Sequence, residues 1–203
     1  MDVEKNKWVL HIAGLGAVGS NLVNKINHNT FLKDKLEVYG WDYDKVEAHN
    51  CGNQFYSYGD IGNYKAAALH KRFPWVHSSC EPYSTDNACD ILVMAVDTMT
   101  ARRIIFHDRH ADFCLDTRLA DDVIISLTDH SIADNLDYND DEVVQQSPCQ
   151  SSFHADKKLV LKSVDWLIEQ LESIVTKQEP AYKERRLIGG HVLEWGDTDV
   201  SIN

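Results

Sequence analysis

Three glycines at Gly-x-Gly-x-x-Gly spacing, Gly14, Gly16 and Gly19, end an apolar run that begins at Trp8. In a strand–turn–helix unit, the first glycine permits a tight turn and the second lets the backbone approach a phosphate. The third brings the helix close to the strand. The N–H groups and the positive dipole end of the following helix also favour an anion. The spacing predicts a phosphate-binding loop, and a glycine-rich turn without a ligand is the alternative.

An acidic residue at a suitable distance strengthens the phosphate-loop interpretation. Asp42 follows a second apolar segment, 36–41, and lies 23 residues after Gly19. This is near the spacing at which a carboxylate of a nucleotide-binding fold accepts hydrogen bonds from ribose hydroxyls. A nucleotide that carries adenosine is therefore the leading ligand.

Further charged side chains are expected at the same edge of a parallel sheet, where strands end and ligands bind. Asp44 lies beside Asp42, Lys65 lies in the first turns of a predicted helix, and Asp97 ends another apolar run. Together they suit a triphosphate, with Lys65 opposing phosphate charge and Asp97 holding Mg2+, which prefers carboxylate and phosphate oxygens. The simpler alternatives are a strand-end carboxylate that caps a helix and a solvated lysine.

The elements that must position these residues alternate between strand and helix. Strands are predicted at 9–13, 36–41, 76–80, 90–97, 113–116 and 123–127, and helices at 18–26, 60–74, 98–106 and 160–175. Residues 42–58 are expected to form a long loop, 129–142 a solvated acidic loop, and 186–202 an edge hairpin. This order predicts an α/β fold with a Rossmann-like, doubly wound, mainly parallel sheet, a C-terminal helix and an edge hairpin.

Composition narrows the class of protein. The 203 residues contain no linker-like segment, so a single domain over 1–203 is expected. A formal net charge of −12 argues against nonspecific nucleic-acid binding. The apolar runs are too short to span a membrane, and the N-terminal segment lacks the form of a signal peptide, which favours the cytoplasm. Five cysteines without a Cys-x-x-Cys pair indicate neither a disulfide framework nor a thiolate zinc site.

Several segments resemble the motifs of the ThiF/MoeB/HesA family, relatives of the ubiquitin-activating enzymes. Residues 42–55 resemble its Asp-Phe-Asp-x-Val-Glu-x-Ser-Asn-Leu-x-Arg-Gln-Phe signature without a gap. Residues 60–66 match Asp-Ile-Gly-x-x-Lys-Ala, and residues 97–102 resemble Asp-Asn-x-x-x-Arg. Four motifs in the right order, with the glycine loop among them, are much more specific than any one alone.

The resemblance implies a domain that binds ATP and Mg2+ and adenylates the C-terminal carboxylate of a small ubiquitin-like or sulfur-carrier protein. It also implies a homodimer or a heterodimer. The residues implied to hold the nucleotide are Gly14, Gly16, Gly19, Asp42, Asp44, Asn50, Asn53, Gln54 and Lys65. Lys65, Asp97 and Arg102 are the implied catalytic residues, with Asp97 on the metal, and Cys149 is the candidate acyl- or sulfur-accepting cysteine.

One departure from the signature keeps other functions open. Asn53 stands where the family has arginine, and an amide cannot supply a cationic fork to phosphate. Arg102 and Arg103 are the candidate replacements for that cation. A second hypothesis is a non-catalytic module that binds ATP, AMP or NAD and regulates or scaffolds a partner. A third is a nicotinamide-dependent oxidoreductase, which the sequence supports least because no Tyr-x-x-x-Lys or comparable proton-transfer set is recognisable.

Overall fold

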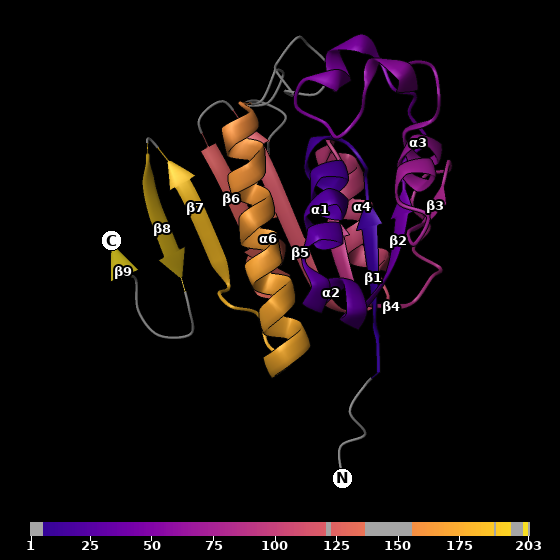
Figure 1. Cartoon of the computed structure of the whole chain (residues 1–203). Coiled ribbons are helices and arrows are strands. Elements are labelled where there is room, and N and C mark those ends of the chain that lie inside the picture. Colours follow the sequence, from indigo (N-terminus) through magenta and orange to yellow (C-terminus); the bar gives the residue numbers. More distant parts are fainter. Residues whose placement is uncertain (1–5, 121–122, 137–155, 189, 196–200, 203) are drawn as a thin grey trace.

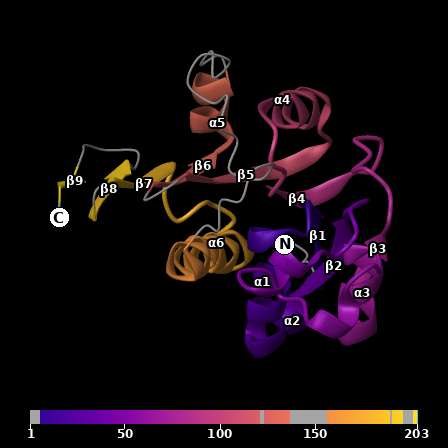
Figure 2. The same cartoon turned by 90° about the horizontal axis from the view of Figure 1, so that it is seen from above.

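The computed structural model describes residues 6–120, 123–136, 156–188, 190–195 and 201–202. The described strands form one nine-stranded sheet with helices on both faces (Figures 1 and 2). The strands are β1 (Trp8–Ala13), β2 (Leu36–Trp41), β3 (His77–Ser79), β4 (Cys89–Met94), β5 (Ala111–Ala120), β6 (Val123–Thr128), β7 (Glu184–Ile188), β8 (His191–Trp195) and β9 (Ser201–Ile202). The α-helices are α1 (Ala17–His28), α2 (Thr30–Lys35), α3 (Lys65–Arg72), α4 (Met99–Asp108), α5 (Asp129–Leu136) and α6 (Lys157–Lys177).

Five parallel strands make the half of the sheet that carries the glycine loop. Their order is β3-β2-β1-β4-β5, so the chain winds in one direction from β1 to β3 and in the other from β4 to β5. The direction changes between β1 and β4, and ligands of doubly wound folds bind at the carboxyl ends of strands at such a point. The glycine loop follows β1 at this edge. The sheet topology therefore places the loop where a ligand is expected.

The other half of the sheet is antiparallel. From β5 onward the strands pair in sequence order as β5-β6-β7-β8-β9. The predicted α/β fold class is confirmed, and so are the C-terminal helix and the hairpin, which β7 and β8 form. The antiparallel part also includes β6 and β9, so it is larger than an edge hairpin alone.

The helices lie in two layers, one on each face of the sheet. Figure 2 shows α1, α2, α3 and α6 below the sheet and α4 and α5 above it. The larger core packs the apolar face of β1, with Leu10 and Ile12, against α1 and against Leu167 and Leu171 of α6. A smaller core lies under α4 and α5. The predicted amphipathic helix at 160–175 is thus confirmed, because its apolar stripe covers α1 and the sheet.

The segment 129–142 is only partly the solvated loop that its acidic composition predicts. Residues 129–136 form α5, in which Ile132 and Leu136, four residues apart, are buried against the sheet. Asp129 accepts a hydrogen bond from the backbone N–H of Cys114 and pairs with Arg109. These apolar and charged contacts outweigh the polar composition. Residues 137–142 lie outside the described part of the chain.

The predicted helix at 60–74 starts later than expected. Asp60 ends a short 3-10 helix, η2 (Tyr58–Asp60), and α3 begins at Lys65. Ile61 and Tyr64, which the predicted helix includes, precede α3 and are each 44% exposed. Asp60 caps η2, where it accepts hydrogen bonds from the backbone N–H and the hydroxyl of Ser57. The expected loop at 42–58 likewise contains a 3-10 helix, η1 (Ala48–Cys51).

Among the described helices, none combines the length and the apolar character that a membrane crossing requires.

Candidate functional site

The three glycines of the loop have different surroundings. Gly14 has a φ of +96°, and a Cβ there would lie 2.6 Å from the carbonyl oxygen of Ala95, just beyond β4. A Cβ on Gly19 would lie 2.0 Å from the carbonyl oxygen of Gly14. A Cβ on Gly16 would meet no described atom within 4 Å beyond its own neighbours. The first and third glycines therefore permit packing, whereas the second borders the open space that a phosphate would need.

Asp42 is joined directly to this loop. Its side chain is buried, and Oδ2 accepts a hydrogen bond of 2.7 Å from the backbone N–H of Leu15. Oδ1 accepts a second bond, of 2.9 Å, from the backbone N–H of Asp44. Burial raises the pKa of the Asp42 carboxyl, and the nearby charge of Lys65 opposes that rise. Because a carboxylate has about four acceptor positions, Asp42 keeps capacity for ribose hydroxyls.

The segment that carries the signature motif is fixed to the glycine loop by side chains of α1. The Ser20 hydroxyl donates to the carbonyl oxygen of Gly16 at 2.6 Å and accepts from the backbone N–H of Phe55 at 3.0 Å. Asn21 donates to the carbonyl oxygen of Asn53 at 2.8 Å. The Tyr56 hydroxyl donates to the carbonyl oxygen of Leu15 at 2.7 Å. Residues 53–56 are thereby held against the loop.

Two amide side chains of this segment lack partners for buried atoms. Asn53 Oδ1 and Gln54 Oε1 are both buried and have no hydrogen-bond partner among the described residues. Buried polar atoms are normally satisfied, so the two amides are suited to accept donors from a ligand. Asn50 differs, because its Oδ1 accepts from the backbone N–H of Glu47 at 2.7 Å and closes a capping box on η1. In this structure Asn50 therefore stabilises the conformation of η1.

Lys65 is the first residue of α3, which agrees with its predicted position in the first turns of a helix. It is only 8% exposed, and its Nζ lies 2.9 Å from Asp44 Oδ2. Its backbone N–H also donates to the carbonyl oxygen of Asp44 at 2.8 Å. The structure therefore brings Asp42, Asp44 and Lys65 together beside the glycine loop.

Asp97 lies at the same edge of the sheet, in the segment that connects β4 to α4. It is exposed, and the helix that follows is capped by Thr98, whose hydroxyl accepts from the backbone N–H of Ala101 at 3.2 Å. Asp97 is thus not needed as the cap. Within the described residues no three acidic, histidine or cysteine side chains gather as a metal site. A single exposed carboxylate still fits Mg2+, which binds through one or two carboxylates together with substrate phosphates.

Arg102 is buried behind the strand ends. Its guanidinium forms an ion pair with Asp116 of β5 and hydrogen bonds to the carbonyl oxygens of Met94, Val96 and Thr117. Asp116 is fully buried and also pairs with Arg118 at 2.7 Å. These contacts connect the end of β4 to β5. In this structure Arg102 therefore stabilises the segment after β4, which contains Asp97. Cys149, the candidate acceptor cysteine, lies outside the described residues.

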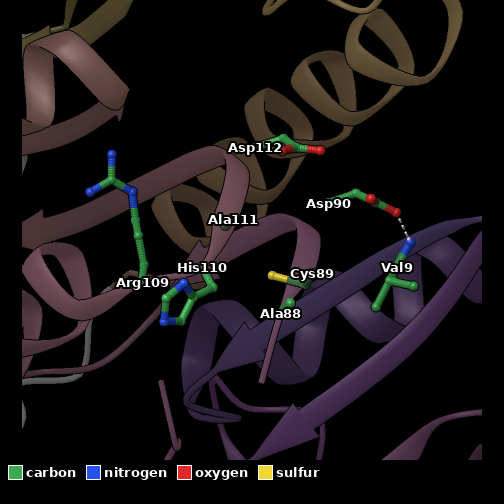
Figure 3. A pocket seen from close by; sticks show the side chains of 8 residues that line it. All are labelled: Val9, Ala88, Cys89, Asp90, Arg109, His110, Ala111 and Asp112. Carbon is green, nitrogen blue, oxygen red and sulfur yellow. Dashed lines mark hydrogen bonds between the residues drawn. The ribbon is translucent and has the colours of Figure 1, made fainter. Parts of the chain in front are cut away.

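A shallow pocket of about 560 Å³ lies at the opposite, amino-terminal edge of the strands (Figure 3). Its lining includes Asp90, whose Oδ2 accepts from the backbone N–H of Val9 at 2.6 Å, together with His110 and Asp112. It also includes Cys89, and burial raises the pKa of that thiol to about 12, which keeps it protonated at neutral pH. No residue predicted for the nucleotide site lines this pocket. The pocket and the candidate site are therefore separate.

Sequence reasoning missed the side chains that support the site. Ser20 and Asn21 directly follow the third glycine, and their polar character on the first turns of a buried helix was an available signal. Asp116 interrupts an apolar strand, and a charge in such a strand needs a buried partner. The contact of Tyr56 with Leu15 had no comparable local signal.

Comparisons with known proteins support the fold. No family model and no curated protein matches the chain. Escherichia coli MccB solved with ATP is 13% identical, with a TM-score of 0.65, and 98% of this chain is covered. Selenomethionine PaaA is 15% identical, with 98% of this chain covered and a TM-score of 0.63. The microcin C7 biosynthetic enzyme MccB in complex with N-formylated MccA is 12% identical, with 98% covered and a TM-score of 0.62.

This chain is shorter than the structures it resembles. It spans 64% of the MccB chain solved with ATP, 64% of PaaA and 65% of the MccB chain solved with MccA. At these identities the likeness demonstrates a shared fold. The likeness does not assign an activity, a substrate or a partner to this chain.

Proposed function

We propose that this chain binds ATP at the glycine loop and adenylates the C-terminal carboxylate of a small ubiquitin-like or sulfur-carrier protein. The observation that carries the proposal is the hydrogen bond from the N–H of Leu15 to the buried carboxylate of Asp42. It fixes that carboxylate next to the open backbone at Gly16. A phosphate bound at Gly16 would then lie next to the carboxylate that we propose as the ribose acceptor. We extend the proposal to a single domain over residues 1–203 that works as a homodimer or heterodimer.

The structural neighbours add support at the level of the fold. MccB has been solved with ATP and with AMPCPP together with MccA, so a fold of this kind accommodates a nucleotide and a second molecule. The motifs at 42–55, 60–66 and 97–102 point the same way. Neither line of support identifies the partner of this chain.

In the proposed reaction, an oxygen of the partner's carboxylate attacks the α-phosphorus of ATP. The bond from that phosphorus to the bridging oxygen breaks, and pyrophosphate leaves. Asp42 would hold the ribose, the glycine loop would hold a phosphate, and Lys65 would oppose phosphate charge. Asp97 would hold Mg2+, which supplies charge neutralisation when bound. Little covalent chemistry falls to the protein, so positioning and electrostatics carry the catalysis.

A non-catalytic nucleotide-binding module is the second candidate function. Asn53 favours it, because the matching position of the resembled family carries a cation and this side chain carries none. Loss of one preorganised electrostatic contact slows catalysis by a few kcal/mol, on the order of 100-fold or more, without abolishing binding. Such a module would hold ATP, AMP or NAD and act on a partner subunit.

Carboxylate-dependent exchange of pyrophosphate into ATP tests the proposed reaction, and a thermal shift with ATP, AMP or NAD tests binding alone. With a candidate partner present, the adenylyltransferase predicts exchange that requires a free C-terminal carboxylate and stops when Mg2+ is removed. Binding without exchange, together with exchange gained by Asn53→Arg, would favour the module. A protein that binds none of these nucleotides would contradict both candidates.

A further inference from the structure

We propose that the Asp44–Lys65 pair limits the phosphate charge that the site accepts, so that without a divalent cation AMP binds at least as tightly as ATP. Asp44 is then a specificity-determining residue, because its carboxylate offsets part of the positive charge with which Lys65 opposes the outer phosphates. This inference rests on the proposed nucleotide site and deepens it by naming the charge of the preferred ligand.

Lys65 is paired with Asp44 of the same chain. Lys65 Nζ lies 2.9 Å from Asp44 Oδ2, with the lysine side chain 10% exposed and the aspartate side chain 54% exposed. Their backbones are also bonded, since the N–H of Lys65 donates to the carbonyl oxygen of Asp44. An adjacent bridge between Lys45 and Tyr64 joins the same two segments. The backbone contacts therefore hold the side chains of Asp44 and Lys65 next to each other.

The other predicted cations also have partners. Arg102 is buried in its ion pair with Asp116. The Nε of Arg103, the next residue of α4, donates to the carbonyl oxygen of Leu136 in α5 at 3.0 Å. The arginines that sequence reasoning offered as replacements for the missing cation at Asn53 thus hold the fold together.

The side chains beside the glycine loop carry a net negative charge. The Asp42 carboxylate accepts from the backbone N–H groups of Leu15 and Asp44, and Lys65 pairs with the Asp44 carboxylate. With both carboxyls ionised, two negative charges and one positive charge leave a formal charge of −1. Backbone N–H groups and the dipole end of α1 suit one phosphate. Each additional phosphate brings negative charge toward a group of side chains that already carries a negative excess.

Position 53 supplies no charge to oppose the outer phosphates. The amide of Asn53 is neutral, and its buried Oδ1 has no partner among the described residues. The amide oxygen accepts from hydroxyl or amino groups, and the amide NH2 can donate a hydrogen bond but carries no positive charge. Asn53 therefore leaves the negative charge of each added phosphate unopposed.

The experiment measures dissociation constants for AMP and ATP by calorimetry, in EDTA and at low salt, for the unmodified protein and two variants. Asp44→Asn removes the charge that holds Lys65. Glu47→Gln removes the same charge from the same loop at a side chain that is 70% exposed and adjoins His49. Glutamine keeps an oxygen that can accept the capping hydrogen bond of Glu47. Circular dichroism checks that all three proteins are folded.

The unmodified protein is expected to bind AMP at least as tightly as ATP. Asp44→Asn should improve ATP binding relative to AMP about two- to fivefold, the range for one partly exposed charge pair, and Glu47→Gln should leave the ratio unchanged. Tighter binding of ATP than of AMP by the unmodified protein would overturn the inference and leave the nucleotide site standing. Equal shifts in the two variants would also overturn it. Failure of a folded protein to bind either nucleotide would instead remove the proposed function.

Discussion

Gly16 and Gly19 are three residues apart, yet substitutions at the two positions should fail for different reasons. Gly16→Val adds a side chain to the open space of the proposed phosphate position, so nucleotide binding should be lost while the fold persists. Gly19→Ala forces a Cβ against the carbonyl of Gly14, so the protein itself should be destabilised. Thermal unfolding with and without ATP distinguishes the two effects. Unchanged ATP affinity in folded Gly16→Val would refute the site.

Arg102 is the residue whose predicted catalytic role is easiest to confuse with a structural one. Arg102→Ala would leave the fully buried Asp116 with Arg118 and without its second ion-pair partner. Removing one member of a buried ion pair destabilises a protein by about 3–5 kcal/mol, so the midpoint of urea unfolding should fall markedly. An unfolding midpoint like that of the unmodified protein, combined with lost exchange activity, would instead assign Arg102 to catalysis.

At the scale of elements, the segment 53–56 depends on α1 for its position. Ser20→Ala removes both the bond to the Gly16 carbonyl and the acceptor for the Phe55 N–H. Each such bond is worth about 0.5–1.5 kcal/mol. Hydrogen exchange at the Phe55 amide should therefore accelerate, and nucleotide affinity should fall while α1 stays helical.

Ser57→Ala is the matched control for this element. Ser57 directly follows this segment, but its hydroxyl contacts Asp60 and Arg72, away from the glycine loop. Its effect on nucleotide affinity should be small. Equal losses of affinity in the two serine variants would mean that the whole segment, and not its contact with the loop, controls binding.

The neighbouring strands β1 and β2 carry a ring cluster with a pH-dependent contribution to stability. His11 is buried, with ring centroids 4.6 Å from Trp41 and 5.5 Å from Tyr39. Burial lowers the pKa of His11 from 6.5 to about 4, against a smaller opposing effect of Asp90. Below about pH 6.5 the unfolded chain binds a proton that the folded chain does not. The free energy of unfolding should therefore fall as the pH drops from about 6.5 toward 4.

Urea unfolding of two histidine variants at pH 7 and pH 5.5 tests this pH effect. His11→Phe should lose part of the decrease in stability over that interval, because phenylalanine does not titrate. His107→Gln should retain the decrease, because His107 is exposed at the end of α4. A decrease of the same size in His11→Phe would assign it to other groups.

At the scale of the molecule, the parallel half of the sheet could be predicted because its signals are local. Apolar runs, glycine spacing and strand-end carboxylates such as Asp42 all lie within short stretches of sequence. Contacts between distant residues could not be predicted in this way. Arg102 meets Asp116 only when β4 and β5 lie side by side, and α5 is helical only because the sheet accepts Ile132 and Leu136. Asn53 was recognisable as a departure, whereas its buried unpaired oxygen required the fold.

The packing of α6 on α1 also has a consequence for biosynthesis. The strands that carry the proposed nucleotide site are complete by β5, but the apolar face of α1 is covered by side chains as late as Leu171. At ribosomal rates of about 5–20 residues per second, that face waits on the order of ten seconds for its cover. During this interval the part of α1 that α6 covers in the folded chain remains in contact with solvent. A chaperone that binds emerging apolar segments would therefore have a target in α1, next to the glycine loop.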